Sequence, residues 1–272
     1  YVTIDKAAVR KSGMMMASDS IPDRMVISLK GKNALYKGDL MMLEMIAQSN
    51  WVRPIYVAST VGQENYMNLG DNFVQEGLAN RITPFTTNKP GAKNFDTQKT
   101  YNNVMNRYKY GGLWRKGIYI DETLMRMCYT HRRIMAQLAL HLISEGDKQK
   151  ASKVLQKAEK ELPPYNIPYS YMNGGLDIAR AYALLGQTAK AKEVANAVWT
   201  QSQQYLNWYL SLDGSRFANS MNDCMLQIYI LRQTAAVMGM ADKQAAAQQE
   251  NKLNMLFKQY QEKGGAIPLD EE

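Results

Sequence analysis

The chain has 272 residues, of which 46% are hydrophobic and 21% are charged. This balance is typical of globular domains and excludes wholesale disorder and collagen-like or low-complexity classes. The sequence contains no run of 18 apolar residues, so it predicts no transmembrane helix. The length exceeds that of one average domain.

The net charge of +8 is concentrated in the first half of the chain. Residues 1–120 hold 16 Lys/Arg against 9 Asp/Glu, whereas residues 201–272 hold 6 against 8. A basic front half suits an anionic neighbour such as a membrane surface, and charge that serves solubility is the alternative. No nucleic-acid partner is expected, because the sequence has neither a basic run nor a nucleic-acid-binding motif.

The first hundred residues mix short strands and helices. Tyr1-Val-Thr-Ile4 is typical of a strand already in progress, from which we expect the sequence to be part of a longer protein. Asp5 is expected to cap a short helix that ends at Lys11. The pattern then predicts a strand over 24–29, a helix over 38–48 and a strand over 53–58. Strand, helix and strand at this spacing favour a right-handed βαβ unit.

A polar loop over residues 86–95 follows a predicted short helix over 71–79 and an edge strand over 81–85. The edge assignment rests on Pro84, which has no N–H to donate to a strand neighbour. We place a domain boundary at this loop. The sequence thus predicts a small α/β domain over residues 1–95 and a helical domain over residues 96–272. Asp96 is expected to cap a helix that runs to about Tyr108.

Two copies of a helical-hairpin pattern lie 40 residues apart in the second domain. Aligning Gly146 with Gly186 superimposes Ala139 on Ala179, Leu142 on Tyr182, Ala151 on Ala191, Leu155 on Ala195 and Ala158 on Val198. Small residues let two helices approach closely, and the glycine permits the turn between them. This order, followed by Pro163, is the tetratricopeptide pattern. The predicted fold is therefore mainly α, with a small α/β N-terminal domain followed by tetratricopeptide-like helical repeats.

A third, degenerate repeat is predicted around Gly239. Ala245 to Ala247 would supply its small residues, although Arg232 occupies the position equivalent to Ala139 and Ala179. A final helix over about 242–262 would end the stack as a polar cap.

The sequence predicts no catalytic residue, no metal site and no cofactor. His131 and His141 lie ten residues apart on one predicted helix, so about 15 Å of helix separates them and they cannot share a metal ion. No metal-ligand cluster, phosphate-binding loop or nucleophile elbow is found. Asp121 is interpreted as a helix cap, and Cys128 and Cys224 as buried free thiols.

A basic stretch on the helix after Asp121 supplies two candidate binding residues. Arg126 and Arg133 are seven residues apart and share one helix face. They could bind a phosphate or a carboxylate. Ion pairs with Asp121, Glu122 or other nearby acids are the alternative.

Two aromatic clusters supply the remaining candidates. Tyr and Trp rings suit a peptide or a sugar, because the ring face covers C–H surface while the polar tip donates a hydrogen bond. Packing in the repeat cores is the alternative. The candidates are Tyr108, Tyr110 and Trp114 from the first cluster and Trp208 and Tyr209 from the second.

Several segments together resemble one known family. They are Asn50 to Tyr56, Glu76 to Leu78, Lys109 to Gly112, Ile118 to Thr123, Arg126-Met127, Thr130 to Arg133 and Trp208 to Leu212. They resemble the C-terminal soluble region of a bacterial family of polytopic membrane proteins of unknown function. That family is similar to GT-C-type glycosyltransferases and is related to protein O-mannosyltransferases with tetratricopeptide repeats.

The resemblance implies a full-length protein that is anchored in the inner membrane and transfers a sugar from a lipid carrier. This region would lie on the periplasmic side, beside its own upstream membrane-spanning part, which would hold the catalytic acid. We therefore expect a non-catalytic tail that binds acceptor polypeptide, glycan or a protein partner. The alternatives are a freestanding tetratricopeptide-repeat adaptor and a self-sufficient enzyme that acts in the aromatic-lined region.

Overall fold

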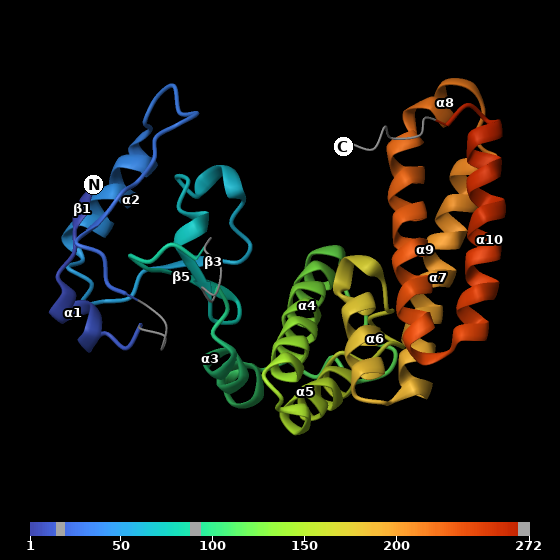
Figure 1. The fold of residues 1–272 in the computed structure, drawn as a ribbon, viewed down its shortest axis with the longest axis horizontal. Helices are drawn as coiled ribbons and strands as arrows, with labels where there is room; N and C mark the ends of the chain where they lie inside the picture. The colour runs from blue at the N-terminus through green and yellow to red at the C-terminus, as the bar shows by residue number, and fades with distance from the viewer. Residues whose placement is uncertain (15–19, 88–93, 266–272) are drawn as a thin grey trace. The chain divides into compact units, whose positions relative to one another are not determined.

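A computed structural model describes residues 1–14, 20–87 and 94–265 of the chain. Helices predominate in this part, and the strands are short and confined to the N-terminal region, which confirms the predicted mainly α class (Figure 1). The chain divides into two compact units, Tyr1–Tyr108 and Lys109–Glu272.

The first unit contains three helices and five strands in the described residues. In chain order they are β1 (Val2–Thr3), α1 (Lys6–Lys11), β2 (Arg24–Met25), α2 (Lys37–Gln48), β3 (Tyr56–Ala58), β4 (Phe73–Gln75), β5 (Ala79–Ile82) and α3 (Thr97–Asn102), which the π-helical turn η3 (Asn103–Arg107) continues. Asp5 caps α1 as predicted, accepting from the amides of Ala7 and Ala8.

The prediction of a right-handed βαβ unit is wrong. The order β2, α2, β3 is present, but β2 and β3 lie in different sheets. β1 pairs with β2, and β5 pairs with both β3 and β4, always antiparallel. The strand predicted over 24–29 ends at Met25, because Ile27 and Leu29 lie beside α2 instead of extending the sheet.

The predictions for residues 71–85 also need correction. Asp71 lies in a single 3₁₀ turn, and the segment then forms β4 and β5, joined through Gly77 at a φ of 94°. β5 is the central strand of its sheet and not an edge. Pro84 lies beyond the end of β5, so its missing N–H costs no sheet hydrogen bond.

The helix over 97–107 belongs to the first unit. Asp96 caps it as predicted, and Lys99 and Asn103 bind the side chain and backbone carbonyl of Glu76 at 3.0 Å each. The two units therefore divide at Tyr108, whereas the sequence analysis places the division at residue 95. Residues 88–93 of the predicted boundary loop lie outside the described part of the chain.

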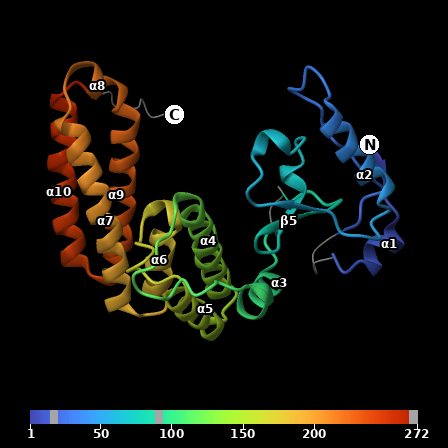
Figure 2. The same cartoon turned by 180° about the vertical axis from the view of Figure 1, so that it is seen from behind.

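The second unit is helical. Its elements are α4 (Glu122–Ser144), α5 (Lys148–Glu161), the 3₁₀ turn η4 (Tyr171–Asn173), α6 (Gly175–Leu184), α7 (Thr188–Ser211), α8 (Gly214–Asn219), α9 (Met221–Ala241) and α10 (Lys243–Glu262). α4 packs on α5 and α6, and α6 packs on α7 and α9. α7, α9 and α10 run side by side, with α8 connecting α7 to α9 (Figures 1 and 2).

The hydrogen bonds that close the first two hairpins recur at the predicted offset of 40 residues. Gly146 donates to the carbonyl of Ile143 and Gly186 to that of Ala183, both at 3.0 Å. The residue after each glycine donates five positions back, at 2.8 and 2.9 Å. Both glycines have positive φ, as the Schellman motif requires at a helix end. The two turns thus share one geometry.

The predicted seam of small residues is confirmed in both hairpins. Ala139 packs in α4 and Ala151 in α5, and neither side chain is exposed. Ala179 and Ala191, the equivalent pair in α6 and α7, are 0% and 1% exposed. All four positions hold alanine, whose side chain is a single methyl group. The paired helices can therefore approach closely.

The third hairpin forms and its last helix covers the predicted range, but its turn lies three residues after Gly239. Gly239 lies inside α9, and the turn occurs at Asp242, whose carboxylate accepts from the amide of Ala245 and starts α10. Arg232 is exposed, and Thr234, which is fully buried, takes the seam position instead. Gly239 does not mark the turn, because the N-cap residue Asp242 begins the second helix of this hairpin.

Candidate binding hollow on the helical hairpins

A hollow of about 420 Å³ lies where α4, η4, α6 and α9 meet. We call it the hairpin hollow. It is lined by Arg133, Tyr171, Met172, Gly174, Leu176, Asp177, Arg180, Tyr229 and Gln233. These residues come from the first helices of three successive hairpins and from the turn that precedes α6.

Helical spacing brings the polar side chains of the hollow together. Asp177 and Arg180 are three residues apart on α6, and Tyr229 and Gln233 are four apart on α9. Residues at these spacings lie on the same helix face. Arg133 adds a second guanidinium from the exposed face of α4.

Gly174 allows α4 and η4 to come together at the edge of the hollow. Its φ is 76°, a left-handed conformation that disfavours other residues. A Cβ atom at this position would lie 3.1 Å from the Cα of Arg133 and 3.4 Å from the Cβ of Ala136. The close approach that places Arg133 in the hollow therefore depends on the missing side chain.

The electrostatics of the hollow are dominated by partial burial. Burial raises the pKa of Asp177 by more than the positive charge of Arg180 lowers it. Burial also raises the pKa of Tyr171, and the neighbouring Tyr229 adds to that increase. The rings of these two tyrosines meet edge to face with their centres 6.3 Å apart.

The hollow combines a surplus of positive charge with apolar surface. The guanidinium groups of Arg133 and Arg180 outnumber the single carboxylate of Asp177. Guanidinium groups bind carboxylates through paired charge-assisted hydrogen bonds. The tyrosine rings and the exposed Met172 offer apolar surface to neighbouring side chains.

Arg132, the residue before Arg133, has the opposite environment. Its side chain is 0% exposed. Nη2 donates to the carbonyl oxygens of Leu162 and Ile167 at 2.6 Å each, and Nη1 donates to that of Pro168 at 3.1 Å. Burial lowers the pKa of this guanidinium to about 10, so the group remains charged at neutral pH. Arg132 therefore holds the loop between the first two hairpins in place.

Of the predicted candidates, Arg133 alone lines the hairpin hollow. Arg126 is exposed and pairs with Glu122, which is the alternative that the sequence analysis left open. The hydroxyl of Tyr108 accepts from the amide of Leu78 at 2.9 Å and so belongs to the first unit. Tyr110 is buried against His131, with ring centres 5.3 Å apart.

The other aromatic candidates lie at separate places in the second unit. The ring of Trp114 is exposed beside Arg115, while the backbone carbonyl of Trp114 accepts from Tyr165. Trp208 is exposed near the end of α7, and its ring centre lies 4.9 Å from that of Tyr209. Tyr209 packs against the core of α7, α9 and α10. The candidates thus form no single aromatic groove.

The sequence did not predict five polar or aromatic residues of the hollow, namely Tyr171, Asp177, Arg180, Tyr229 and Gln233. The repeat register contained a signal for two of them, because Asp177 and Arg180 flank the seam residue Ala179 on the outer side of α6. Tyr229 could not be found in this way, because the register of the third hairpin was misassigned. Tyr171 lies in a turn with no periodic pattern.

Within residues 1–14, 20–87 and 94–265, no group of three or more His, Cys, Asp or Glu side chains could hold a metal ion. No helix in the described part of the chain has the length and hydropathy to cross a membrane. Cys128 and Cys224 are buried free thiols, as predicted.

Comparison with known protein families gives a match within the first unit. Residues 1–101 match the family model of TMEM260-associated domain 2. This match fits a domain of a membrane-protein family. It extends from β1 into α3 and does not cover the helical hairpins. No curated protein and no solved structure matches the chain.

Proposed function

We propose that this chain is a non-catalytic, extramembrane part of a membrane-associated protein and that its hairpin hollow binds an acidic segment of polypeptide. The proposal rests chiefly on one observation: Arg133, Arg180 and the exposed Tyr229 line the same hollow. The first two hairpins share one turn geometry and bury alanines at equivalent positions, and stacked helical repeats commonly present a concave surface to a partner. The match over residues 1–101 supports the membrane setting.

The proposal extends to the setting that the family resemblance implies. The polypeptide would be the acceptor of a sugar that a membrane-embedded part of the same protein transfers on the periplasmic side of the inner membrane. The chain itself would hold the acceptor and leave the bond-making to that part. Incubation of the 272-residue chain with a lipid-linked sugar and an acidic peptide should give no product. Measurable sugar transfer would overturn the non-catalytic role.

Fluorescence anisotropy with short labelled peptides tests the hollow directly. Acidic peptides should bind the chain more tightly than neutral or basic peptides of the same length. Joint replacement of Arg133→Gln and Arg180→Gln should lower the affinity about tenfold or more, since a hydrogen bond to a charged group contributes roughly 1.5–3 kcal/mol. Tyr229→Ala should weaken binding of every peptide that carries apolar side chains.

Arg126→Gln is the matched control for this titration. Arg126 is an exposed arginine on the same helix, but it pairs with Glu122 and does not line the hollow. This variant should bind acidic peptides as the wild type does. Equal losses in the Arg126 and Arg133 variants would point to a general charge effect, and no binding to any peptide would refute the proposal.

The alternative is a freestanding adaptor that uses the same hollow to recruit a folded protein. Its distinguishing property is preference for structured over unfolded partners. If the hollow binds acidic segments only within folded proteins, and Arg133→Gln abolishes that binding, the adaptor role replaces the acceptor role.

A second hollow favours glycan as a further ligand. It lies in the first unit, has a volume of about 720 Å³ and is lined by five amide side chains and two aromatic rings, together with Gly70, Asp71 and Thr87. Its amides are Gln63, Asn68, Gln75, Asn80 and Asn94, and its rings are Tyr66 and Phe73. Amides hydrogen-bond sugar hydroxyls as donor and acceptor, and rings cover sugar C–H surface.

Calorimetric titration with neutral oligosaccharides tests this second site. Binding should weaken in Gln63→Ala, whose side chain is exposed at the hollow. Gln48→Ala, an exposed amide on α2 outside the hollow, should leave it unchanged. Absence of heat with every oligosaccharide would exclude a glycan ligand here.

A further inference from the structure

The first unit leaves most of the apolar face of α2 uncovered. Of the seven apolar residues in this helix, Ile46 alone is buried. Leu40 and Met41 are 53% and 56% exposed, and Met45 is exposed to a similar degree. A helix of a globular domain normally buries such a face. This face therefore needs an apolar partner that the described residues do not supply.

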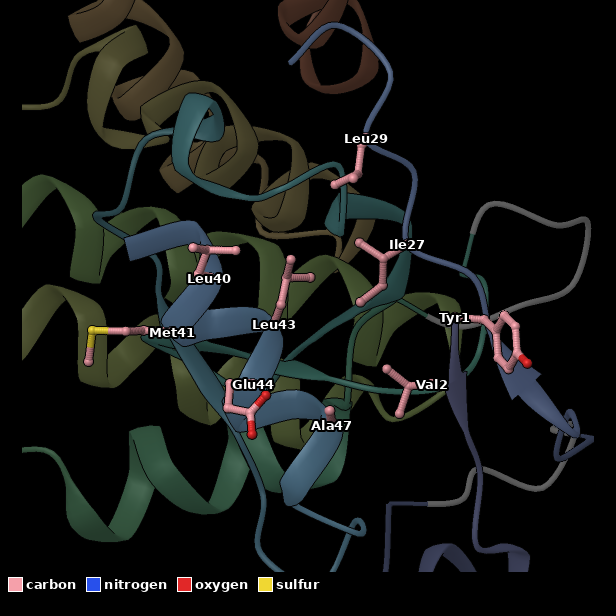
Figure 3. Close-up of a pocket in the computed structure, with 9 residues that line it drawn as sticks. All are labelled: Tyr1, Val2, Ile27, Leu29, Leu40, Met41, Leu43, Glu44 and Ala47. Carbon is pink, nitrogen blue, oxygen red and sulfur yellow. The ribbon is translucent and has the colours of Figure 1, made fainter. Parts of the chain in front are cut away.

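A shallow apolar hollow of about 610 Å³ adjoins this helix (Figure 3). It is lined by Tyr1, Val2, Ile27, Leu29, Leu40, Met41, Leu43, Glu44 and Ala47. Leu40 and Leu43 point toward the segment that carries Ile27 and Leu29 (Figure 3). The apolar surface therefore continues from α2 across to the chain that follows β2. We call this surface the α2 patch.

Basic side chains surround the α2 patch in sequence. Residues 24–53 contain five Lys/Arg and two Asp/Glu. Arg24, Lys30, Lys37 and Arg53 are exposed, and the remaining cation, Lys32, pairs with Asp39 at 3.0 Å. Glu44 is the one acid that lines the hollow, and it is exposed to solvent. The segment that carries the patch is thus net positive, and Arg24 lies over the ring of Tyr1 at the hollow.

We propose that the α2 patch docks this unit onto the surface of a membrane that contains anionic lipid. The exposed Leu and Met side chains would enter the boundary between headgroups and acyl chains, and the lysines and arginines of the same segment would bind the headgroups. The same unit matches a domain associated with a membrane-protein family, which agrees with a position at the bilayer.

Flotation with lipid vesicles tests the docking, using the whole 272-residue chain. Vesicles of phosphatidylcholine with phosphatidylglycerol should carry the chain upward, and vesicles of phosphatidylcholine alone should carry much less. The joint change of Leu40→Ser and Met41→Ser should lower the apparent affinity for anionic vesicles at least about tenfold. Because both side chains are more than half exposed, the thermal unfolding midpoint should stay near that of the wild type.

The matched control changes a leucine and a methionine of the second unit that are also exposed, Leu184→Ser with Met255→Ser. These side chains are 42% and 60% exposed. The control variant should float with anionic vesicles as the wild type does. Equal loss in both double variants would overturn the proposal, as would failure of the wild type to bind any vesicle.

A charge variant keeps the test valid if the serine variant unfolds. Lys30→Glu with Lys37→Glu should reduce binding to anionic vesicles and weaken its dependence on salt. If instead the wild type ignores vesicles but self-associates through Leu40 and Met41, the patch joins two copies of the chain and membrane docking is refuted. The peptide titration reports on the second unit, so its outcome is independent of this one.

Discussion

The guanidinium carbon of Arg132 lies 4.7 Å from the centre of the Tyr169 ring. Tyr169 ends the loop whose carbonyl oxygens accept from the same guanidinium. One fully buried cation thus holds the segment between the first two hairpins by hydrogen bonds and by a cation–π contact. The loop adds six residues to the usual spacing of 34 in tetratricopeptide repeats, and Arg132 gives it a fixed conformation.

Replacing Arg132 with Met should destabilise the chain. Methionine fills much of the volume but leaves the carbonyl oxygens of Leu162 and Ile167 without their donor, whereas that of Pro168 still accepts from Asn173. Each buried acceptor left unpaired costs about 1–3 kcal/mol, so we expect a loss of roughly 2 kcal/mol or more in the free energy of unfolding. Urea denaturation measures this loss. Arg133→Met, on the exposed face one position later, should change it by about 0.5 kcal/mol or less.

The free energy of unfolding should depend on pH in the alkaline range because Tyr169 is buried. Burial raises the pKa of its phenol to about 12, against about 10 in the unfolded chain. Between these two values the unfolded chain has released the phenolic proton and the folded chain has kept it. The unfolded state then binds fewer protons, so stability falls as pH rises through this window.

The variant Tyr169→Phe removes this titration. When the pH is raised from about 9 to about 11, the free energy of unfolding should fall by roughly 1 kcal/mol less in Tyr169→Phe than in the wild type. Tyr119→Phe, which changes a highly exposed phenol, should follow the wild type. Parallel stability curves for wild type and Tyr169→Phe would contradict burial of this phenol.

Overpacking the alanine seam should destabilise both hairpins. Ala139 and Ala179 are fully buried between paired helices. Leucine at either position should cost about 1–3 kcal/mol, because the helices must move apart to admit it. Thermal unfolding measures the cost. Ala247→Leu on the exposed face of α10 is the control, and an unchanged midpoint in both seam variants would refute the close helix approach.

Gly174→Ala should cost more than a positive φ alone explains. Gly186 has nearly the same φ, 74° against 76°, but a Cβ atom there would meet nothing within 4 Å. Gly186→Ala should therefore cost about 1–2 kcal/mol for the left-handed backbone. At Gly174 the added Cβ also meets Arg133 and Ala136. Urea denaturation should therefore show a larger loss of unfolding free energy for Gly174→Ala than for Gly186→Ala. The affinity of Gly174→Ala for acidic peptides should also fall. Equal losses would show that α4 and η4 adjust freely.

The sequence predicted the helical hairpins because each contains several local signals that agree. Gly146 and Gly186 terminate helices, Asp147 caps the next helix, and the alanines recur at helical spacing. The sheets of the first unit gave no such agreement. Their strands have two to four residues, too few for an alternating pattern, and their pairing joins segments distant in sequence.

The hairpin hollow was predicted only at Arg133 for a similar reason. Arg132 and Arg133 are identical in type and adjacent, but one residue of helix turns the side chain by about 100°. The acceptors that hold Arg132 inside belong to a loop some 30 residues later in the chain. No local pattern shows which arginine faces that loop. The partners of Arg133 come from α6 and α9, which helix packing alone brings together.

Asp177 should lower the stability of the folded chain at neutral pH and weaken the binding of acidic peptides to the hollow. Burial raises its pKa above the unfolded value of about 3.9, so the folded chain holds the proton more tightly than the unfolded chain. Stability is then lost as pH rises through the pKa of the folded state. Asp177→Asn should therefore be more stable than the wild type at pH 7, and the difference should shrink toward about pH 3.

The same variant should bind acidic peptides more tightly, because it removes the one carboxylate that repels them beside Arg133 and Arg180. Urea denaturation at both pH values and the peptide titration measure the two effects. Glu250→Gln, an exposed change on α10, should alter stability by about 0.5 kcal/mol or less at either pH and leave binding unchanged. Weaker binding of acidic peptides by Asp177→Asn would mean that Asp177 orients the arginines, and the hollow would then select its ligand by geometry more than by net charge.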